Sequence, residues 1–205
     1  MFEIVNGHKL RKKVRAVIEN EQGQFLLIQP HGYDSDAWTL VGGGVELNES
    51  NEQAILREIR EETGIDGVIR LQISKVVHWF CFSDKIKRQR QLDHDGQIAK
   101  VFFAIVPTNA VVLIQQSEIQ AFIWASPKEA EGLIKNLEQR NLFKEIVTEF
   151  RDNRLHRLTP GHPRRARPRA RNTDPGYPAQ AGVLRLSRRQ PCAAVGRKGE
   201  GSPTL

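Results

Sequence analysis

The sequence predicts an α/β protein with a mixed sheet, and three observations support this class. Strand-like and helix-like segments alternate between residues 13 and 150, no segment is an internal repeat, and the composition is that of a folded domain. Hydrophobic residues make up 39% and charged residues 27% of the 205 positions, which excludes a collagen-like, mucin-like or wholly disordered chain. No apolar run approaches the length needed to cross a bilayer, so we expect no membrane span.

The first elements predict a β-hairpin. Residues 13–19 alternate in polarity and are rich in β-branched side chains, which is typical of a strand. Residues 20–23 have the composition of a turn, and residues 24–29 form a second apolar segment. The strongest helical pattern in the chain covers residues 50–63, and Gly64 is a natural stop for it.

The second half of the body continues with strands and ends with helices. Strand-rich segments are expected at residues 67–83, 97–107 and 119–125, with a polar loop after the first of them. Ser126 and Pro127 supply a cap and a first-turn proline, so they open a helical region. Residues 136–150 predict a final helix.

Charge and proline content change together near residue 150. Residues 151–205 hold 13 Lys and Arg against 3 Asp and Glu, and seven of the ten prolines, whereas residues 1–150 have a net charge of −3. This composition predicts a folded domain at 1–150 and a disordered basic tail at 151–205. The run HPRRARPRARN in the tail suits either an RNA-binding or localisation patch or a solvated, self-repelling segment. A shifted reading frame would produce the same change in composition.

Cysteine content and the N-terminal segment predict a cytoplasmic protein. Cys81 and Cys192 are too few for a disulfide framework or a cysteine-based zinc site. Residues 1–19 lack the apolar core of a signal peptide.

Three carboxylates in the predicted helix indicate a metal site. Glu58, Glu61 and Glu62 fall within one arc of a helix, where they repel one another unless a cation lies between them. Hard oxygen ligands of this kind favour Mg²⁺ or Mn²⁺. Just before the helix, Gly42, Gly43 and Gly44 allow a tight turn, a close backbone approach to a ligand and an exposed carbonyl that can complete a metal shell.

The stretch from Gly43 to Ile65 resembles the Nudix box of MutT-like hydrolases, whose pattern is G-x5-E-x7-R-E-U-x-E-E-x-G-U with U a bulky aliphatic residue. Every fixed position is matched, by Gly43, Glu49, Arg57, Glu58, Ile59, Glu61, Glu62, Gly64 and Ile65. The resemblance implies a Nudix-type α/β/α sandwich with a mixed sheet. An ordinary acidic helix would not also place the two glycines and Glu49 at these offsets.

The resemblance also implies roles for individual residues. Glu58, Glu61 and Glu62 would hold Mg²⁺ (or Mn²⁺), with the Gly42 carbonyl as a further ligand. Glu58 is a candidate general base, and Glu118, in the loop before the last strand, is an alternative one. The box residues Gly43, Glu49, Arg57 and Gly64 would be structural, with Arg57 and Glu49 orienting helix and loop through a salt bridge.

The implied substrate is a nucleotide-type small molecule, a nucleoside diphosphate linked to another group, cleaved at its pyrophosphate linkage by water. Trp38 is a candidate for stacking on a base. The basic side chains Lys85, Lys87, Arg88 and Arg90 are candidates for gripping phosphates, or belong to a solvated loop. A capped RNA 5′ end is a less favoured substrate, because the net charge of residues 1–150 is negative.

Two other functions have to be weighed. A non-catalytic Nudix-fold module that senses nucleotide or RNA typically lacks one or more of the box acids, whereas this chain has all of them. An isopentenyl diphosphate isomerase would need a further catalytic cysteine and metal-binding histidines, which Cys81 alone does not supply. The sequence gives no indication of oligomeric state or of the particular leaving group.

Overall fold

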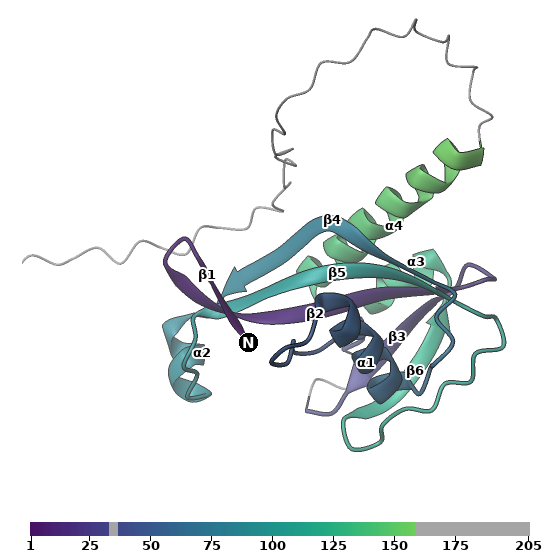
Figure 1. Cartoon of the computed structure of the whole chain (residues 1–205). Helices are drawn as coiled ribbons and strands as arrows, with labels where there is room; N and C mark the ends of the chain where they lie inside the picture. Colours follow the sequence, from purple (N-terminus) through teal and green to yellow (C-terminus); the bar gives the residue numbers. More distant parts are fainter. Residues whose placement is uncertain (33–36, 159–205) are drawn as a thin grey trace, which may run out of the picture.

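The computed structural model describes residues 1–32 and 37–158 and shows a six-stranded mixed sheet with helices on both faces (Figure 1). The predicted α/β/α sandwich is therefore confirmed. The strands are β1 (Phe2–Val5), β2 (His8–Asn20), β3 (Phe25–Pro30), β4 (Arg70–Cys81), β5 (Gly96–Val106) and β6 (Ile119–Ala125). The helices are α1 (Asn51–Thr63), α2 (Asp84–Gln89), α3 (Pro127–Leu133) and α4 (Leu137–Leu158).

Strand β2 organises the sheet, whose order is β4-β5-β2-β3-β6 with β1 paired to β2. β2 and β5 are parallel from Leu10–Gly96 to Asn20–Val106, and the other strand pairs are antiparallel. β2 meets β3 at its far end, at Glu19–Phe25. Nearer its start, isolated bridges join β2 to residues 41–44, which we call the glycine segment. This segment therefore runs along β2 like a short extra strand.

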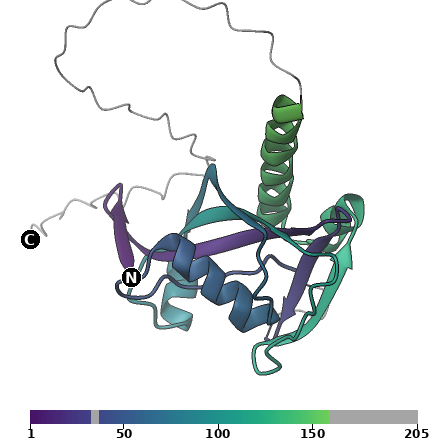
Figure 2. The same ribbon diagram turned by 45° about the vertical axis from the view of Figure 1, so that its right-hand side comes forward.

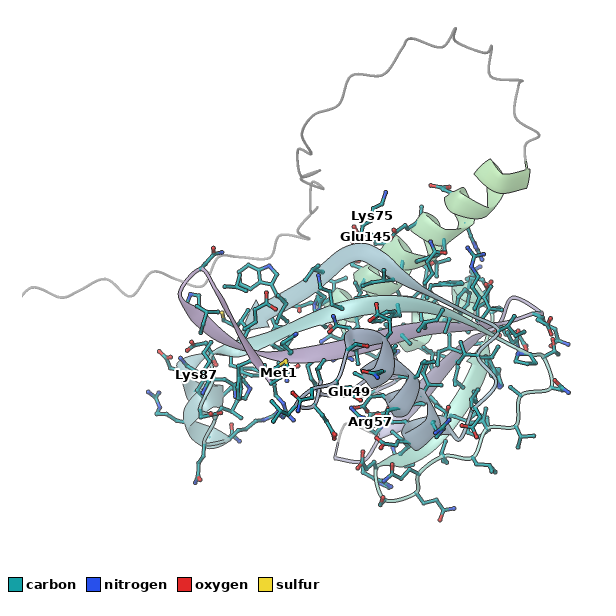
Figure 3. The ribbon with its side chains drawn as sticks, viewed as in Figure 1. Met1, Glu49, Arg57, Lys75, Lys87 and Glu145 are labelled. Carbon is teal, nitrogen blue, oxygen red and sulfur yellow. The ribbon has the colours of Figure 1, made fainter. Side chains whose placement is uncertain are left out.

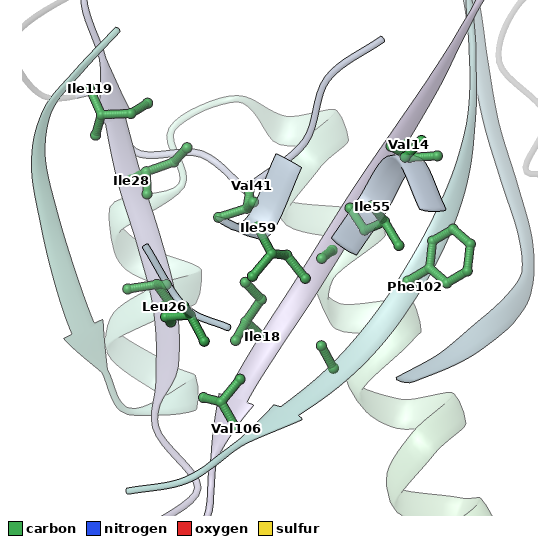
Figure 4. Packing of buried hydrophobic residues seen from close by; sticks show 14 of the residues in the cluster. Val14, Ile18, Leu26, Ile28, Val41, Ile55, Ile59, Phe102, Val106 and Ile119 are labelled. Carbon is green, nitrogen blue, oxygen red and sulfur yellow. The ribbon is translucent and has the colours of Figure 1, made fainter. Parts of the chain in front are cut away.

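Two hydrophobic clusters hold the layers together. Under α1, alternate residues of β2 pack with the buried face of the helix; members of this cluster include Val14, Ile18, Ile55, Ile59 and Phe102 (Figure 4). The opposite face of the sheet is covered by α3 and α4 through Val17, Leu27, Phe143, Ile146 and Phe150, among others. The turned view shows α1 and α4 on opposite sides of the sheet (Figure 2). The buried side of α1 is thus held against the sheet.

Helix α1 begins and ends as the sequence predicts. Ser50 accepts a hydrogen bond from the Gln53 amide at 3.1 Å, and the Gln53 side chain accepts one from the Ser50 amide at 2.8 Å. This reciprocal cap satisfies two amides that the helix leaves without partners. Gly64 ends the helix in the left-handed conformation, with φ 70°, and donates from its amide to the Arg60 carbonyl. The acidic face is therefore carried on a helix with both ends fixed.

Most predicted elements are present, and three differ. β1 was not predicted, because its four residues become a strand only by pairing with β2. The expected polar loop contains α2, which Ser83 caps by accepting from the Ile86 amide. Helix α4 continues to Leu158, past its predicted end at Phe150, and no glycine or proline interrupts the chain before Pro160.

The basic run at 162–172 and most of the predicted tail lie outside the described residues. The division into a domain at 1–150 and a tail therefore stays a prediction. In the part of the chain that the structure describes, none of the helices combines the length and apolar character that a membrane crossing requires.

A pair of glycine substitutions tests how α1 is stopped. A Cβ at Gly64 would lie 2.9 Å from the Leu113 Cβ and would force a left-handed backbone on an L-residue. Gly64→Ala should therefore lower the free energy of unfolding by about 1–2 kcal/mol. The control, Gly132→Ala in α3, meets nothing within 4 Å and should raise it by roughly 0.5–1 kcal/mol. Urea unfolding of both variants measures this, and equal stabilities would contradict it.

Candidate active site

The glycine segment is attached to β2 by backbone hydrogen bonds. The Val14 amide donates to the Gly43 carbonyl at 3.0 Å, and the Ala16 amide donates to the Val41 carbonyl at 2.9 Å. Carbonyls on either side of Gly42 are thus taken up by the strand. Among the described residues, the Gly42 carbonyl itself accepts no hydrogen bond. The segment therefore leaves one backbone oxygen available for a ligand.

Gly42 has to be glycine because the β2 backbone passes too close for a side chain, and at Gly43 a side chain would displace the Glu58 carboxylate. Gly42 has φ 152°, and a Cβ there would lie 2.2 Å from the Val14 carbonyl oxygen. A Cβ at Gly43 would lie 2.0 Å from Oε1 of Glu58. The Gly42 amide donates to Oε2 of Glu62 at 2.9 Å. Two box acids of α1 thus lie directly against the glycine segment.

Arg57 donates five hydrogen bonds, one of which joins the helix to this segment. Nε and Nη2 donate to the two oxygens of Glu49 at 2.8 and 3.0 Å, and Nη2 also donates to the Gly44 carbonyl at 2.9 Å. Nη1 donates to Glu58 at 3.0 Å and to Glu61 at 2.8 Å. The salt bridge expected between Arg57 and Glu49 is present, and the two residues lie together in Figure 3. This planar, bidentate arrangement is one that only arginine can make.

The site charges shift one another's pKa values. Hydrogen bonds from Arg57 hold the pKa of Glu49 below its ordinary value. Burial raises the pKa of Glu58, although Arg57 opposes the shift. Burial also raises the pKa of Glu62 to about 7, against the hydrogen bond from the Gly42 amide, and the negative charges of Glu58 and Glu118 add to the increase. The two acids beside the glycines are thus poorly compensated when ionised, as expected of a functional site.

The structure brings Glu118 into the electrostatic environment of Glu62 but does not gather the three helix acids around one point. The Glu61 side chain is 50% exposed and is held by Arg57. Within residues 1–32 and 37–158, no group of three or more His, Cys, Asp or Glu side chains is close enough to hold a metal ion. The residues that do fit an oxygen-binding cation are Glu58, Glu62 and the Gly42 carbonyl, since all three lie at the glycine segment.

The sequence analysis missed two basic residues of the site, Lys13 and Arg15. Lys13 lies across from Gly44 on β2 and interacts electrostatically with Glu58 and Glu62, and Arg15 interacts with Glu62. The available signal was their spacing, because Lys13 and Arg15 stand at alternate positions on either side of the apolar Val14 in a strand.

The weaker substrate-binding candidates have other contacts in the described structure. Trp38 is partly buried and packs on the cluster under α3 and α4. Lys87 lies on α2, well away from Glu49 and Arg57 in Figure 3, and pairs with Asp84 and Asp95. The other three basic candidates, Lys85, Arg88 and Arg90, lie on or directly after the same short helix. A phosphate-binding role for this group stays a prediction.

Comparison with known proteins agrees with the box and the fold. Residues 9–146 match the model of the NUDIX domain family. The chain belongs to the NUDIX domain family. With the full set of box acids, it is a Nudix hydrolase, an enzyme class that acts on acid anhydrides.

Its relatives in this family include two proteins with assigned activities. It is 34% identical to the CTP pyrophosphohydrolase of Escherichia coli over 124 residues, which are 60% of this chain and 80% of that protein. It is 33% identical to the nucleoside triphosphatase NudI of Escherichia fergusonii over 136 residues, 63% and 92% of the two chains. Among solved structures, the MutT protein of Methanosarcina mazei superimposes with a TM-score of 0.54 and 27% identity, over 69% of this chain and 95% of that one.

Replacing Arg57 should destabilise the Nudix domain far more than replacing its neighbour Arg60. Arg57→Ala leaves Glu49 and Glu58, which are 13% and 12% exposed, without their counter-ion. We expect a loss of about 3 kcal/mol. The control is Arg60→Ala, one turn away on α1, which removes an ion pair with Asp66 whose partners are both about 70% exposed. It should cost no more than about 1 kcal/mol. Denaturant unfolding without metal compares them, and similar losses would disprove the role of Arg57.

The raised pKa of Glu62 predicts a stability that falls as pH rises. Between its ordinary value of 4.5 and about 7, the folded protein keeps a proton that the unfolded chain has lost. The free energy of unfolding of the metal-free protein should therefore decrease across this window. Glu62→Gln should flatten the decrease, whereas Glu52→Gln, at an exposed position in the first turn of α1, should leave it unchanged. Urea titrations in EDTA measure the slopes, and identical slopes for Glu62→Gln and the parent would contradict the prediction.

Proposed function

We propose that this Nudix hydrolase uses Mg²⁺ or Mn²⁺ to cleave the pyrophosphate linkage of a nucleotide-type substrate, a nucleoside triphosphate or another nucleoside diphosphate derivative. The observation that carries the proposal is the complete set of box acids on α1, two of which lie against the glycine segment. The relatives named for CTP and nucleoside triphosphate hydrolysis support this substrate class.

The donors at the glycine segment suit a divalent cation. Burial raises the pKa values of Glu58 and Glu62, and the negative charge of Glu58 adds to the cost of ionising Glu62. A cation between these carboxylates and the Gly42 carbonyl would remove that cost. Glu61 would join the set by exchanging its hydrogen bond with Arg57 for the cation. When bound, the metal would polarise a phosphoryl oxygen and activate water.

The protein's own residues would orient and deprotonate the water. Arg57 holds Oε1 of Glu58, which leaves the second carboxylate oxygen to accept a proton from the attacking water. Glu118 is the alternative base, because its charge acts on Glu62 from the loop that leads into β6. We place the base at Glu58, since it is held by a defined hydrogen bond beside the glycine segment.

A capped RNA 5′ end is a less favoured substrate, and a non-catalytic nucleotide sensor is the rival function. Lys87 of α2 is engaged with Asp84 and Asp95 of its own loop, and the net charge of residues 1–150 is negative. A sensor would bind nucleotide without turnover. From its sequence, we expect the protein to act in the cytoplasm. None of the helices in the described part of the chain could span a membrane.

A substrate panel with metal removal tests the proposal. The purified full chain should hydrolyse at least one of a set of nucleoside triphosphates, dinucleoside polyphosphates, ADP-ribose and capped RNA in Mg²⁺. Dialysis into EDTA should abolish turnover, and Mg²⁺ or Mn²⁺ should restore it better than Ca²⁺, which prefers more ligands and a looser geometry. Product analysis by phosphate position identifies the bond that is cleaved.

Two isosteric variants assign the base. At saturating Mg²⁺, Glu58→Gln should lower kcat by about 10²–10⁴-fold, and Glu118→Gln should have a smaller effect. Glu52→Gln, on the exposed side of the same helix, is the matched control and should leave kcat unchanged. A larger loss in Glu118→Gln would move the base to the loop. Nucleotide binding by the parent with no hydrolysis of any panel substrate would establish the sensor function instead.

A further inference from the structure

The loop that carries Glu118 is attached on one side to the last turn of α1. This loop covers residues 107–118, between β5 and β6, and its alternate apolar side chains pack on the cluster under α1. The amides of Leu113 and Gln115 donate to the carbonyls of the last two residues of α1, at 2.8 and 3.4 Å. The loop therefore follows the end of the helix that carries the box acids.

The other side of the loop is held by His31, the residue directly after β3. A turn at residues 115–119 is closed by two amides that donate to the Gln115 carbonyl, both at 2.9 Å. The His31 amide donates to the Glu118 carbonyl at 2.7 Å. Its Nε2 donates to the Gln116 carbonyl at 3.0 Å, and has to carry the hydrogen because a carbonyl only accepts. His31 thus contacts the turn at two points.

The neighbours of His31 in the chain place it at this turn. Pro30 has no amide hydrogen, and the register of the β3–β6 ladder shifts at this residue, so the next amide that can donate is that of His31. Gly32 has φ 77°, in the left-handed region that favours glycine, and it turns the chain after His31. His31 is exposed, so its side chain is not part of the core.

We propose that His31 is a positioning residue that holds Glu118 at the site of the proposed reaction. Its two hydrogen bonds fix the turn on both sides of Ser117, directly before the Glu118 side chain. Glu118 interacts electrostatically with Glu62 from this turn. Without the imidazole bond, conformations in which Glu118 lies away from the site should become more populated. This inference rests on the proposed function, because it concerns the same site.

A double-mutant cycle with a hydrolysed nucleotide of the panel tests the role of His31. At saturating Mg²⁺, His31→Ala should lower kcat by about three- to tenfold, the usual worth of one hydrogen bond, with little change in KM. It should have no further effect in a Glu118→Gln background, where there is no charged carboxylate left to position.

Two further variants separate the hydrogen bond from other effects of the substitution. His31→Gln keeps an N–H donor of similar reach and should retain most of the kcat. The matched control is His8→Ala, which removes a histidine that pairs with Asp95 at the start of β2, and should leave kcat unchanged. An equal loss of kcat for His31→Ala with and without the Glu118 carboxylate would overturn the inference.

Hydrogen exchange of the ligand-free full chain measures the same contact without turnover. The amides of Glu118 and Ile119, which close the turn, should exchange about three- to tenfold faster in His31→Ala than in the parent. Exchange of the Gly64 amide, at the end of α1, should be unchanged, and so should the melting temperature, because the substituted side chain is exposed.

The exchange data also distinguish failure of the inference from failure of the proposed function. Unchanged exchange at the turn would overturn the inference, and so would faster exchange at Gly64 together with a lower melting temperature, which would show a general loss of stability. If no panel substrate is hydrolysed while exchange at the turn still depends on His31, hydrolysis is refuted and the attachment of the Glu118 turn to His31 is supported.

Discussion

The hydrogen-bond set of Arg57 is the constraint on which the rest of the site depends. The glycine segment is fixed to β2 by its backbone, and α1 is fixed to the sheet by apolar side chains such as Ile55 and Ile59. Across the gap between the acidic face and the loop, these attachments are completed by polar contacts, of which the bond from the Gly42 amide to Glu62 is one. Arg57 supplies most of the others, because its five donors reach Glu49 before the helix, two acids on the helix and the Gly44 carbonyl. Lysine could not replace such a planar set of donors.

The same closeness makes the site electrostatically costly. A side chain at Gly42 would meet the β2 backbone, and one at Gly43 would displace Glu58, so the two glycines let the segment lie close to both. Once there, the carboxylates lose solvation and repel one another, which raises the pKa of Glu58 and Glu62. Local conflicts of this kind are expected at functional sites, where stability is given up for an arrangement that a ligand completes.

Local sequence signals predicted the elements that depend on local interactions. Helix α1 could be placed because its periodicity and the stop at Gly64 are encoded within one segment. β1 and α2 were missed because their stability comes from pairing with β2 and from contacts such as Lys87 with Asp95, which sequence spacing does not reveal. Box residues were recognisable by their offsets. Lys13, in contrast, joins the site only because the glycine segment pairs with β2, so its position depends on tertiary structure.

The division of the acids between Arg57 and the glycine segment bears on how a cation would enter. Arg57 holds both Glu58 and Glu61, and a cation that draws on these acids has to compete with the guanidinium for them. Glu61 is 50% exposed and can rotate into water and back at little cost, whereas Glu58 is 12% exposed and confined against Gly43. Because a bidentate pair with Glu49 keeps Arg57 in place throughout, the exchange need move only one side chain. The arginine thus stabilises the site without metal, and it would keep Glu58 in place for the proposed cation.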